Sequence, residues 1–169
     1  RFSTASSLLM PLRQAKDEHE IACLRHAARL IEKAFSASLE RIKPGATMQD
    51  ITEEIDSEIV RLGAAGNSFA TDLIFAGPGF QGRPTHDFNE PIGPGCMIAY
   101  DIGLVYQGYC SDFGRSVIVG EPGPGYLEHY QMLREARNAA VSRLRPGVRA
   151  QEVHEEIRRV FAAYGWERE

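Results

Sequence analysis

The chain has 169 residues, a length that suits one domain with a sizeable hydrophobic core. Its 43% apolar and 25% charged residues are ordinary for a globular protein, and its net charge of −4 provides no basic footprint for nucleic acid. No apolar run approaches the roughly 20 residues that a membrane-spanning helix needs. We therefore expect neither nucleic acid nor a membrane as a partner.

The first third of the chain has the pattern of two helices. Steps of three and four between apolar residues predict a helix over residues 16–43, whose apolar face is formed by Ile21, Leu24, Ala28, Ile31, Phe35, Leu39 and Ile42. Pro44-Gly45 ends this helix. Thr47, with Asp50 three residues later, is typical of an N-cap, and predicts a second helix that ends near Gly63.

The middle of the chain has the pattern of β-structure. Residues 69–76 are rich in apolar and β-forming side chains and predict a strand, whereas residues 77–95 are rich in Pro and Gly and predict a loop. Residues 96–104 and 109–119 then predict the two strands of a hairpin. The sequence EPGPG at 121–125 interrupts the pattern before two further helices, expected at 126–144 and 151–164.

A repeat links the two helical regions. Residues 41–63 (RIKPGATMQDITEEIDSEIVRLG) align without a gap with residues 143–165 (RLRPGVRAQEVHEEIRRVFAAYG), and share Arg, Pro-Gly, Gln, Glu-Glu, Ile and a final Gly. Chance similarity between two amphipathic helices is the alternative explanation. A duplication predicts an α+β domain with pseudo-two-fold symmetry. Strands follow the first copy but only four residues follow the second, so we expect the sequence to be a fragment of that domain.

The three cysteines, Cys23, Cys96 and Cys110, have no CxxC spacing and are odd in number. This argues against a disulfide framework and indicates a reducing compartment, the cytoplasm.

Two aspartates in the predicted hairpin are candidate metal ligands. Asp101 lies in an apolar run and Asp112 follows eleven residues later. A turn with an even number of residues puts both on the same face: directly opposite at roughly 5 Å if the turn is Tyr106-Gln107, or diagonal at roughly 7 Å if it is Gln107-Gly108. Two carboxylates so close favour a shared cation, since otherwise one of them takes a proton. Hard oxygen ligands suit Mn²⁺, Mg²⁺ or Ca²⁺, and do not exclude Zn²⁺ or Co²⁺.

A polar hairpin without a metal is the alternative interpretation. Asp112 then pairs with Arg115, and Asp101 lies on a solvated face. His86, in the loop RPTHDFNEP, could bind a substrate carbonyl, ligate a metal or simply lie at the surface.

Together these motifs resemble a known superfamily. An Asp in YDIG, a second Asp eleven residues later in GYCSDFGRS, a His fifteen residues before the first Asp, and helices ending in KPG and RPG resemble the pita-bread metallopeptidases. The opening SLLMPLRQAKDEHEIACLRHAARL is similar to the Xaa-Pro aminopeptidase and Xaa-Pro dipeptidase (prolidase) branch. In that branch a separate domain precedes this helix, so the resemblance implies that residues 1–14 are a linker and that residues 15–169 are a truncated catalytic domain.

The resemblance also implies roles for three residues. Asp101 and Asp112 match the first two ligands of a site for two divalent metal ions, with manganese expected and cobalt or zinc possible. His86 matches a catalytic histidine that contacts the substrate near the scissile bond. The family's remaining ligands, one His and two Glu, would lie beyond Glu169, so the fragment alone is expected to be inactive.

The activity implied by the resemblance is metal-dependent hydrolysis of the peptide bond before proline in short peptides, by a homodimer. A non-catalytic pita-bread module that binds protein partners, a methionine aminopeptidase and a creatinase-like hydrolase are the alternatives.

Overall fold

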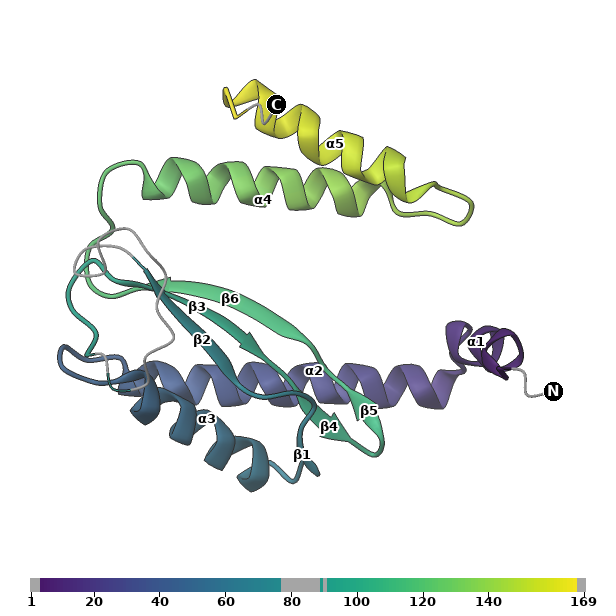
Figure 1. Cartoon of the computed structure of the whole chain (residues 1–169), viewed down its shortest axis with the longest axis horizontal. Helices are drawn as coiled ribbons and strands as arrows, with labels where there is room; N and C mark the ends of the chain where they lie inside the picture. The colour runs from purple at the N-terminus through teal and green to yellow at the C-terminus, as the bar shows by residue number, and fades with distance from the viewer. Residues whose placement is uncertain (1–3, 77–88, 90, 167–169) are drawn as a thin grey trace. The chain divides into compact units, whose positions relative to one another are not determined.

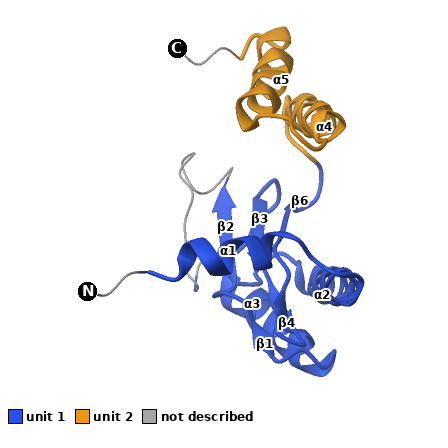
Figure 2. Ribbon diagram, turned by 90° about the vertical axis from the view of Figure 1, so that its right-hand side faces the viewer, with its two compact units in different colours: residues 1–121 blue, residues 122–169 orange. Residues whose placement is uncertain are grey.

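The structure, a computed structural model, describes residues 4–76, 89 and 91–166. The chain divides into two compact units, residues 1–121 and residues 122–169 (Figure 2). The boundary falls in the EPGPG segment, where the sequence pattern is interrupted. Each unit is described separately below.

The first unit combines helices with antiparallel strands (Figure 1). Its helical elements are α1 (Ser6–Gln14), α2 (Glu18–Ser38), the 3-10 turn η1 (Leu39–Arg41) and α3 (Met48–Arg61). Its strands form two three-stranded sheets, in the orders β2-β3-β6 and β1-β4-β5. The strand bounds are β1 (Gly66–Asn67), β2 (Asp72–Ala76), β3 (Met97–Ile102), β4 (Leu104–Tyr106), β5 (Tyr109–Cys110) and β6 (Phe113–Ile118).

Both long helices of this unit begin at a capping box. The Asp17 side chain accepts a hydrogen bond from the Glu20 backbone amide, and the Glu20 carboxylate accepts one from the Asp17 amide, which starts α2. Thr47 and Asp50 make the same reciprocal pair at the start of α3. The N-cap predicted at Thr47 is thereby confirmed.

The apolar face predicted for the first long helix is only partly correct. Ile31 is buried, and Phe35 and Ile42 pack against the core, but Ala28 and Leu39 are exposed. The face of α2 that is buried is instead formed by Cys23, Ala27, Leu30, Ile31, Ala34 and Ser38. Several of these residues are small, and small side chains let a helix backbone approach a sheet closely.

The predicted hairpin is confirmed and its turn is resolved. Met97 pairs with Ile118 and, at the far end, Tyr106 pairs with Tyr109, in one unbroken register. The two-residue turn is Gln107-Gly108, and both residues have positive φ, 49° and 83°. Positive φ at both central positions is the mark of a type I′ turn, whose twist matches that of the flanking strands. Gly108 adopts this conformation without steric cost.

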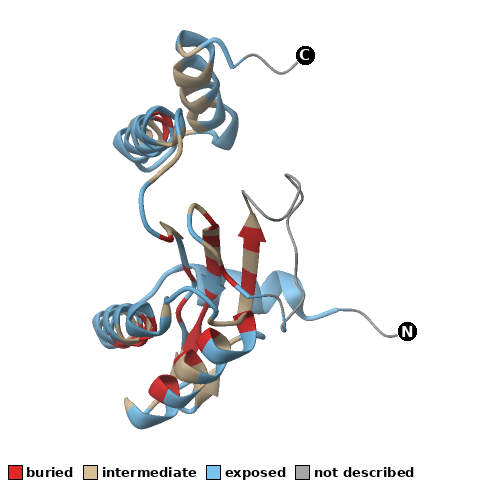
Figure 3. Ribbon diagram, turned by 90° about the vertical axis from the view of Figure 1, so that its left-hand side faces the viewer, coloured by how far each residue is buried: buried red, intermediate tan, exposed pale blue. Residues whose placement is uncertain are grey.

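One face of the sheet forms the core with the helices, and Figure 3 shows buried positions recurring along the strands. Along β3, Ile98, Tyr100 and Ile102 are buried, whereas Met97, Ala99 and Asp101 are not. The Phe35 ring of α2 lies 5.0 Å from the Tyr100 ring. Even-numbered residues of β3 therefore face the helices, and odd-numbered residues lie on the opposite surface, which we call the open face. The same alternation puts Asp72, Gly114 and Ser116 on the open face.

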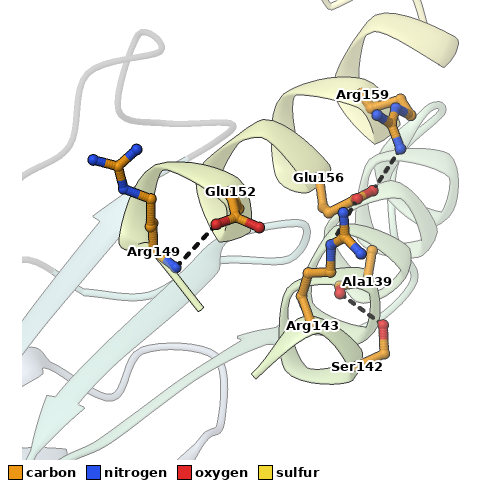
Figure 4. Close-up of polar contacts among 7 residues, drawn as sticks. All are labelled: Ala139, Ser142, Arg143, Arg149, Glu152, Glu156 and Arg159. Carbon is orange, nitrogen blue, oxygen red and sulfur yellow. Dashed lines mark hydrogen bonds and ion pairs between the residues drawn. The ribbon is translucent and has the colours of Figure 1, made fainter. Parts of the chain in front are cut away.

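The second unit is a helical hairpin of α4 (Tyr126–Arg143) and α5 (Ala150–Ala163), as the sequence predicts. Figure 4 shows Glu156 of α5 joined to α4 by an ion pair with Arg143 at 3.1 Å, and paired within α5 with Arg159 at 2.8 Å. The repeat is visible in the core positions. Ile51, Ile55 and Ile59 of α3 are buried, whereas their counterparts on α5, Val153, Ile157 and Phe161, are only half-buried.

Two elements were not predicted from the sequence. Residues 6–14 form helix α1, although no residue of it is buried, and residues 66–67 form the short strand β1. The linker role of residues 1–14 stays a prediction. The predicted loop at 77–95 lies largely outside the described residues. Within the described part of the chain, no helix is long and apolar enough to cross a membrane.

Candidate metal centre

The hairpin register places Asp101 and Asp112 on the same face of the sheet. Asp101 pairs with Gly114, so Asp112, two residues from Gly114, occupies the diagonal position. Diagonal neighbours on one face of an antiparallel pair are roughly 7 Å apart. This matches the alternative in which the turn is Gln107-Gly108. The shared face is the open face, and both aspartates are exposed.

A third carboxylate lies on the same face. Asp72 of β2 pairs directly with Asp101 in the β2–β3 register, and like charges at directly opposite positions are destabilising unless something compensates them. The sequence analysis did not identify Asp72. The sequence alone gives no clear signal for it, because Leu73, Ile74 and Phe75 are all apolar; the burial of Leu73 and Phe75 in the structure shows that Asp72 lies on the other face.

Arg115 does not serve as the partner of Asp112. Its guanidinium donates a hydrogen bond to the Gly114 carbonyl at 2.9 Å and lies 4.6 Å from the centre of the Phe113 ring. Arg115 also pairs with Tyr100, which places it on the other face from Asp112. The ion pair expected in the polar-hairpin interpretation is therefore absent among the residues that the structure describes.

The strand ladder opens at one position, beside the two aspartates. Gly103 separates β3 from β4, and Ser111 and Asp112 separate β5 from β6. Ser68, which follows β1, donates its amide to the Gly103 carbonyl at 3.1 Å and its hydroxyl to the Ser111 carbonyl at 3.0 Å. A Cβ on Gly103 would lie 2.3 Å from the Ser68 Oγ and 2.4 Å from the Ser111 carbonyl oxygen, so no larger residue fits without a rearrangement.

The tip of the hairpin is fixed to α2 by three contacts. The Tyr109 hydroxyl donates to the Glu20 carboxylate at 3.2 Å, the Cys23 thiol donates to the Gln107 side-chain oxygen at 3.5 Å, and the His26 and Tyr106 rings lie 4.3 Å apart. Burial and the neighbouring Glu20 carboxylate raise the pKa of Tyr109. The hairpin is therefore held at its tip, while Asp101 lies on β3 and Asp112 lies in the segment between β5 and β6.

Tyr100 is the buried neighbour of Asp101 on the core face. Its hydroxyl is buried without a hydrogen-bond partner in the described part of the chain. Burial raises the pKa of Tyr100 to about 12, and the nearby Ser38 side chain opposes this shift only in part. Tyr100 is therefore a neutral phenol at physiological pH.

The carboxylates fit a hard divalent cation in part. Carboxylate oxygens are the ligands that Mg²⁺ and Mn²⁺ prefer, and exposed side chains on an open face can turn to a shared ion. In the described residues, however, no group of three or more His, Cys, Asp or Glu side chains is placed to hold a metal. Asp101 and Asp112 can therefore supply two ligands, and other ligands must complete the site. His86 lies outside the described residues.

An α+β unit with a carboxylate pair on the sheet face opposite its own core helices is a scaffold suited to metal-assisted hydrolysis. Comparison with family models identifies the class: residues 22–169 match metallopeptidase family M24, and the chain belongs to that family.

Known relatives agree with this assignment. The chain is 29% identical over 167 residues to the Xaa-Pro dipeptidase of Pyrococcus horikoshii, covering 98% of the chain and 47% of that protein. It is 28% identical over 170 residues to an uncharacterized peptidase of Staphylococcus aureus, again covering 47% of that protein. The chain thus spans about half the length of the curated relatives it matches.

Solved structures show the same fold. The prolidase from Thermococcus sibiricus matches with a TM-score of 0.82 and 30% identity, over 95% of this chain and 44% of that one. The X-Pro aminopeptidase from Thermotoga maritima matches with a TM-score of 0.83 and 26% identity, over 94% and 45% of the two chains. The predicted α+β pita-bread fold is confirmed.

Proposed function

We propose that the full-length protein hydrolyses the peptide bond before proline in short peptides, and that Asp101 and Asp112 hold part of a site for two divalent cations, with manganese as the expected metal. The observation that carries the proposal is the register of the hairpin, which puts both carboxylates on the open face in a chain of family M24. The dipeptidase and prolidase relatives support proline in the second position of the substrate.

The roles of this chain's residues follow from their chemistry. Bound cations would supply a water that ionises near neutral pH. Asp101 and Asp112 would hold the cations at the sheet through their carboxylate oxygens, and Asp72 would add negative charge to the same face. His86, placed by the resemblance alone, would donate a hydrogen bond to the substrate carbonyl and stabilise the charge that develops on its oxygen.

Proline lacks an amide hydrogen, so the site would recognise the shape of its ring. We further propose a homodimer in a reducing compartment, the cytoplasm. The three free cysteines support the compartment, and the Xaa-Pro branch that the sequence resembles supports the dimer.

The test is a peptidase assay of the full-length protein with and without added Mn²⁺. Hydrolysis of Ala-Pro that requires the metal, with Met-Gly left intact, is expected. Cleavage of Met-Gly instead would favour a methionine aminopeptidase. A folded, metal-loaded protein that cleaves neither peptide would overturn the proposal and favour a binding module.

Asp101→Asn and Asp112→Asn are the matched variants for this assay. Each removes one carboxylate ligand and keeps the size of the side chain, so each is expected to lose activity. Glu121→Gln, at an exposed loop position, is the control for loss of a carboxylate charge away from the site.

A further inference from the structure

We propose that Ser68 and Ser111 are positioning residues, whose hydroxyl groups hold the strand ladder open beside the aspartate pair and thereby set the direction of Asp112. The inference rests on the proposed function, because positioning matters only if Asp101 and Asp112 share a metal site. Neither serine would touch the metal.

The hydrogen bonds around Leu104 and Ser111 carry the argument. These residues face each other in the hairpin register, and the bond from the Ser111 amide to the Leu104 carbonyl marks them as one of the alternate pairs that exchange two backbone hydrogen bonds in a regular antiparallel ladder. Only one is made, from the Ser111 amide to the Leu104 carbonyl at 2.8 Å. The Leu104 amide donates instead to the Ser111 Oγ at 3.1 Å.

The Ser111 carbonyl, which would accept from the Leu104 amide in a regular ladder, has a different partner. The Ser111 carbonyl accepts the hydroxyl of Ser68 at 3.0 Å. Two serine hydroxyls therefore replace one ladder hydrogen bond. The backbone amides and carbonyls of Leu104 and Ser111, which we call the opened rung, all remain paired. The replacement is buried, since Ser111 is 6% exposed and Leu104 is fully buried. Buried amides and carbonyls without partners are costly, so the hydroxyls are required to keep the rung open.

The opened rung controls the aspartates through the backbone. The Ser111 carbonyl belongs to the peptide group that joins Ser111 to Asp112, so its direction fixes the rotation of the chain as it enters Asp112. Closing the rung would turn this peptide plane toward Leu104 and re-aim the Asp112 side chain. Gly103, opposite Asp112 and two residues after Asp101, provides the space for Ser68 to enter.

The test measures Mn²⁺ affinity of the full-length protein by the EPR signal of free Mn²⁺, with Ser111→Ala and Ser68→Ala. Ser111→Ala leaves the Leu104 amide unpaired, and Ser68→Ala leaves the Ser111 carbonyl unpaired. Each is expected to weaken Mn²⁺ binding by about 10- to 100-fold, the range seen when a residue that orients a metal ligand is lost, although here the serines act on the backbone beside Asp112 and not on its carboxylate. If Ser111→Ala does not fold, Ser68→Ala decides, because it keeps the Leu104–Ser111 contacts.

Two controls separate positioning from simple loss of stability. Ser36→Ala removes an exposed serine hydroxyl that donates to the Glu32 carbonyl on α2, and should change neither stability nor affinity. Ile59→Val opens a small cavity in the core of the same unit, and should lower Tm with the affinity unchanged.

The outcomes are distinct. Affinities within twofold of wild type in both serine variants, or losses no larger than that of Ile59→Val, would overturn the positioning role while the proposed function stands. A wild-type protein that binds no Mn²⁺ would overturn the proposed function and this inference with it.

Discussion

Replacing Asp101 with Asn should stabilise the metal-free chain. Asp101 lies directly opposite Asp72 and diagonally from Asp112, so three carboxylates occupy one face of the sheet. Asn has nearly the same size and no charge. A cross-strand pair contributes about 0.2–1 kcal/mol, and like charges act with the opposite sign, so we expect a gain of about 0.5 kcal/mol in the free energy of unfolding. For a chain of this size the gain corresponds to about 1–2 °C in Tm.

The assay is thermal and urea unfolding of the wild type and Asp101→Asn in EDTA at pH 7, at low salt and in 1 M NaCl. Screening should shrink the difference at high salt. Glu121→Gln, the same charge change at an exposed loop position, is the control and should have no effect. If Asp101→Asn is less stable than the wild type, or if its gain is independent of salt, then the carboxylate is compensated and the argument from repulsion is wrong.

Three further predictions test other parts of the structure. Tyr100→Phe removes a buried hydroxyl without a hydrogen-bond partner, so it should be neutral or stabilising by up to about 1 kcal/mol in urea unfolding at pH 7; a loss of 2 kcal/mol would contradict this. The pKa of Tyr100 is raised from 10.0 to about 12 in the fold, so its contribution to stability is complete below pH 10 and is lost as the pH rises to about 12. Only the wild type should show that loss, on the order of 2 kcal/mol, and identical pH profiles for Tyr100→Phe and wild type would refute it. Thr47→Ala breaks the capping box of α3 and should cost about 1 kcal/mol by chemical denaturation; no change would show that the cap is dispensable. In the 169-residue chain, Ile55→Ala should cost about 2–5 kcal/mol because Ile55 is fully buried, whereas Ile157→Ala, its half-buried counterpart on α5, should cost less; equal costs would contradict the difference in burial.

Local patterns in the sequence predict the helices and the hairpin well. The cap at Thr47 and the Pro-Gly stops depend on neighbouring residues alone. The hairpin turn was predicted only to within two alternatives, and the structure selects Gln107-Gly108, where the positive φ values suit a glycine. Once the turn is fixed, the alternation of side chains puts Asp101 and Asp112 on one face without further information. These predictions succeed because each requires only contacts that are close along the chain.

Features that depend on distant segments could not be predicted in the same way. The helical period predicts a stripe of apolar residues over 16–43 but does not say which residues of the stripe approach the sheet, so the predicted apolar face included Ala28 and Leu39, which are exposed. Strand β1 has only two residues and exists because β4 pairs with it. The insertion of Ser68 beside Gly103 joins positions far apart in the sequence, and no local pattern signals it. Asp72 was missed because its partner across the sheet, Asp101, is known only once the register is known.

The most direct test of the central claim is a crystal structure of the full-length protein with Mn²⁺, with the metal located by anomalous scattering. The account predicts an anomalous peak on the open face, coordinated by carboxylate oxygens of both Asp101 and Asp112. An anomalous peak elsewhere in a protein fully loaded with Mn²⁺, with neither aspartate coordinating the metal, would contradict it.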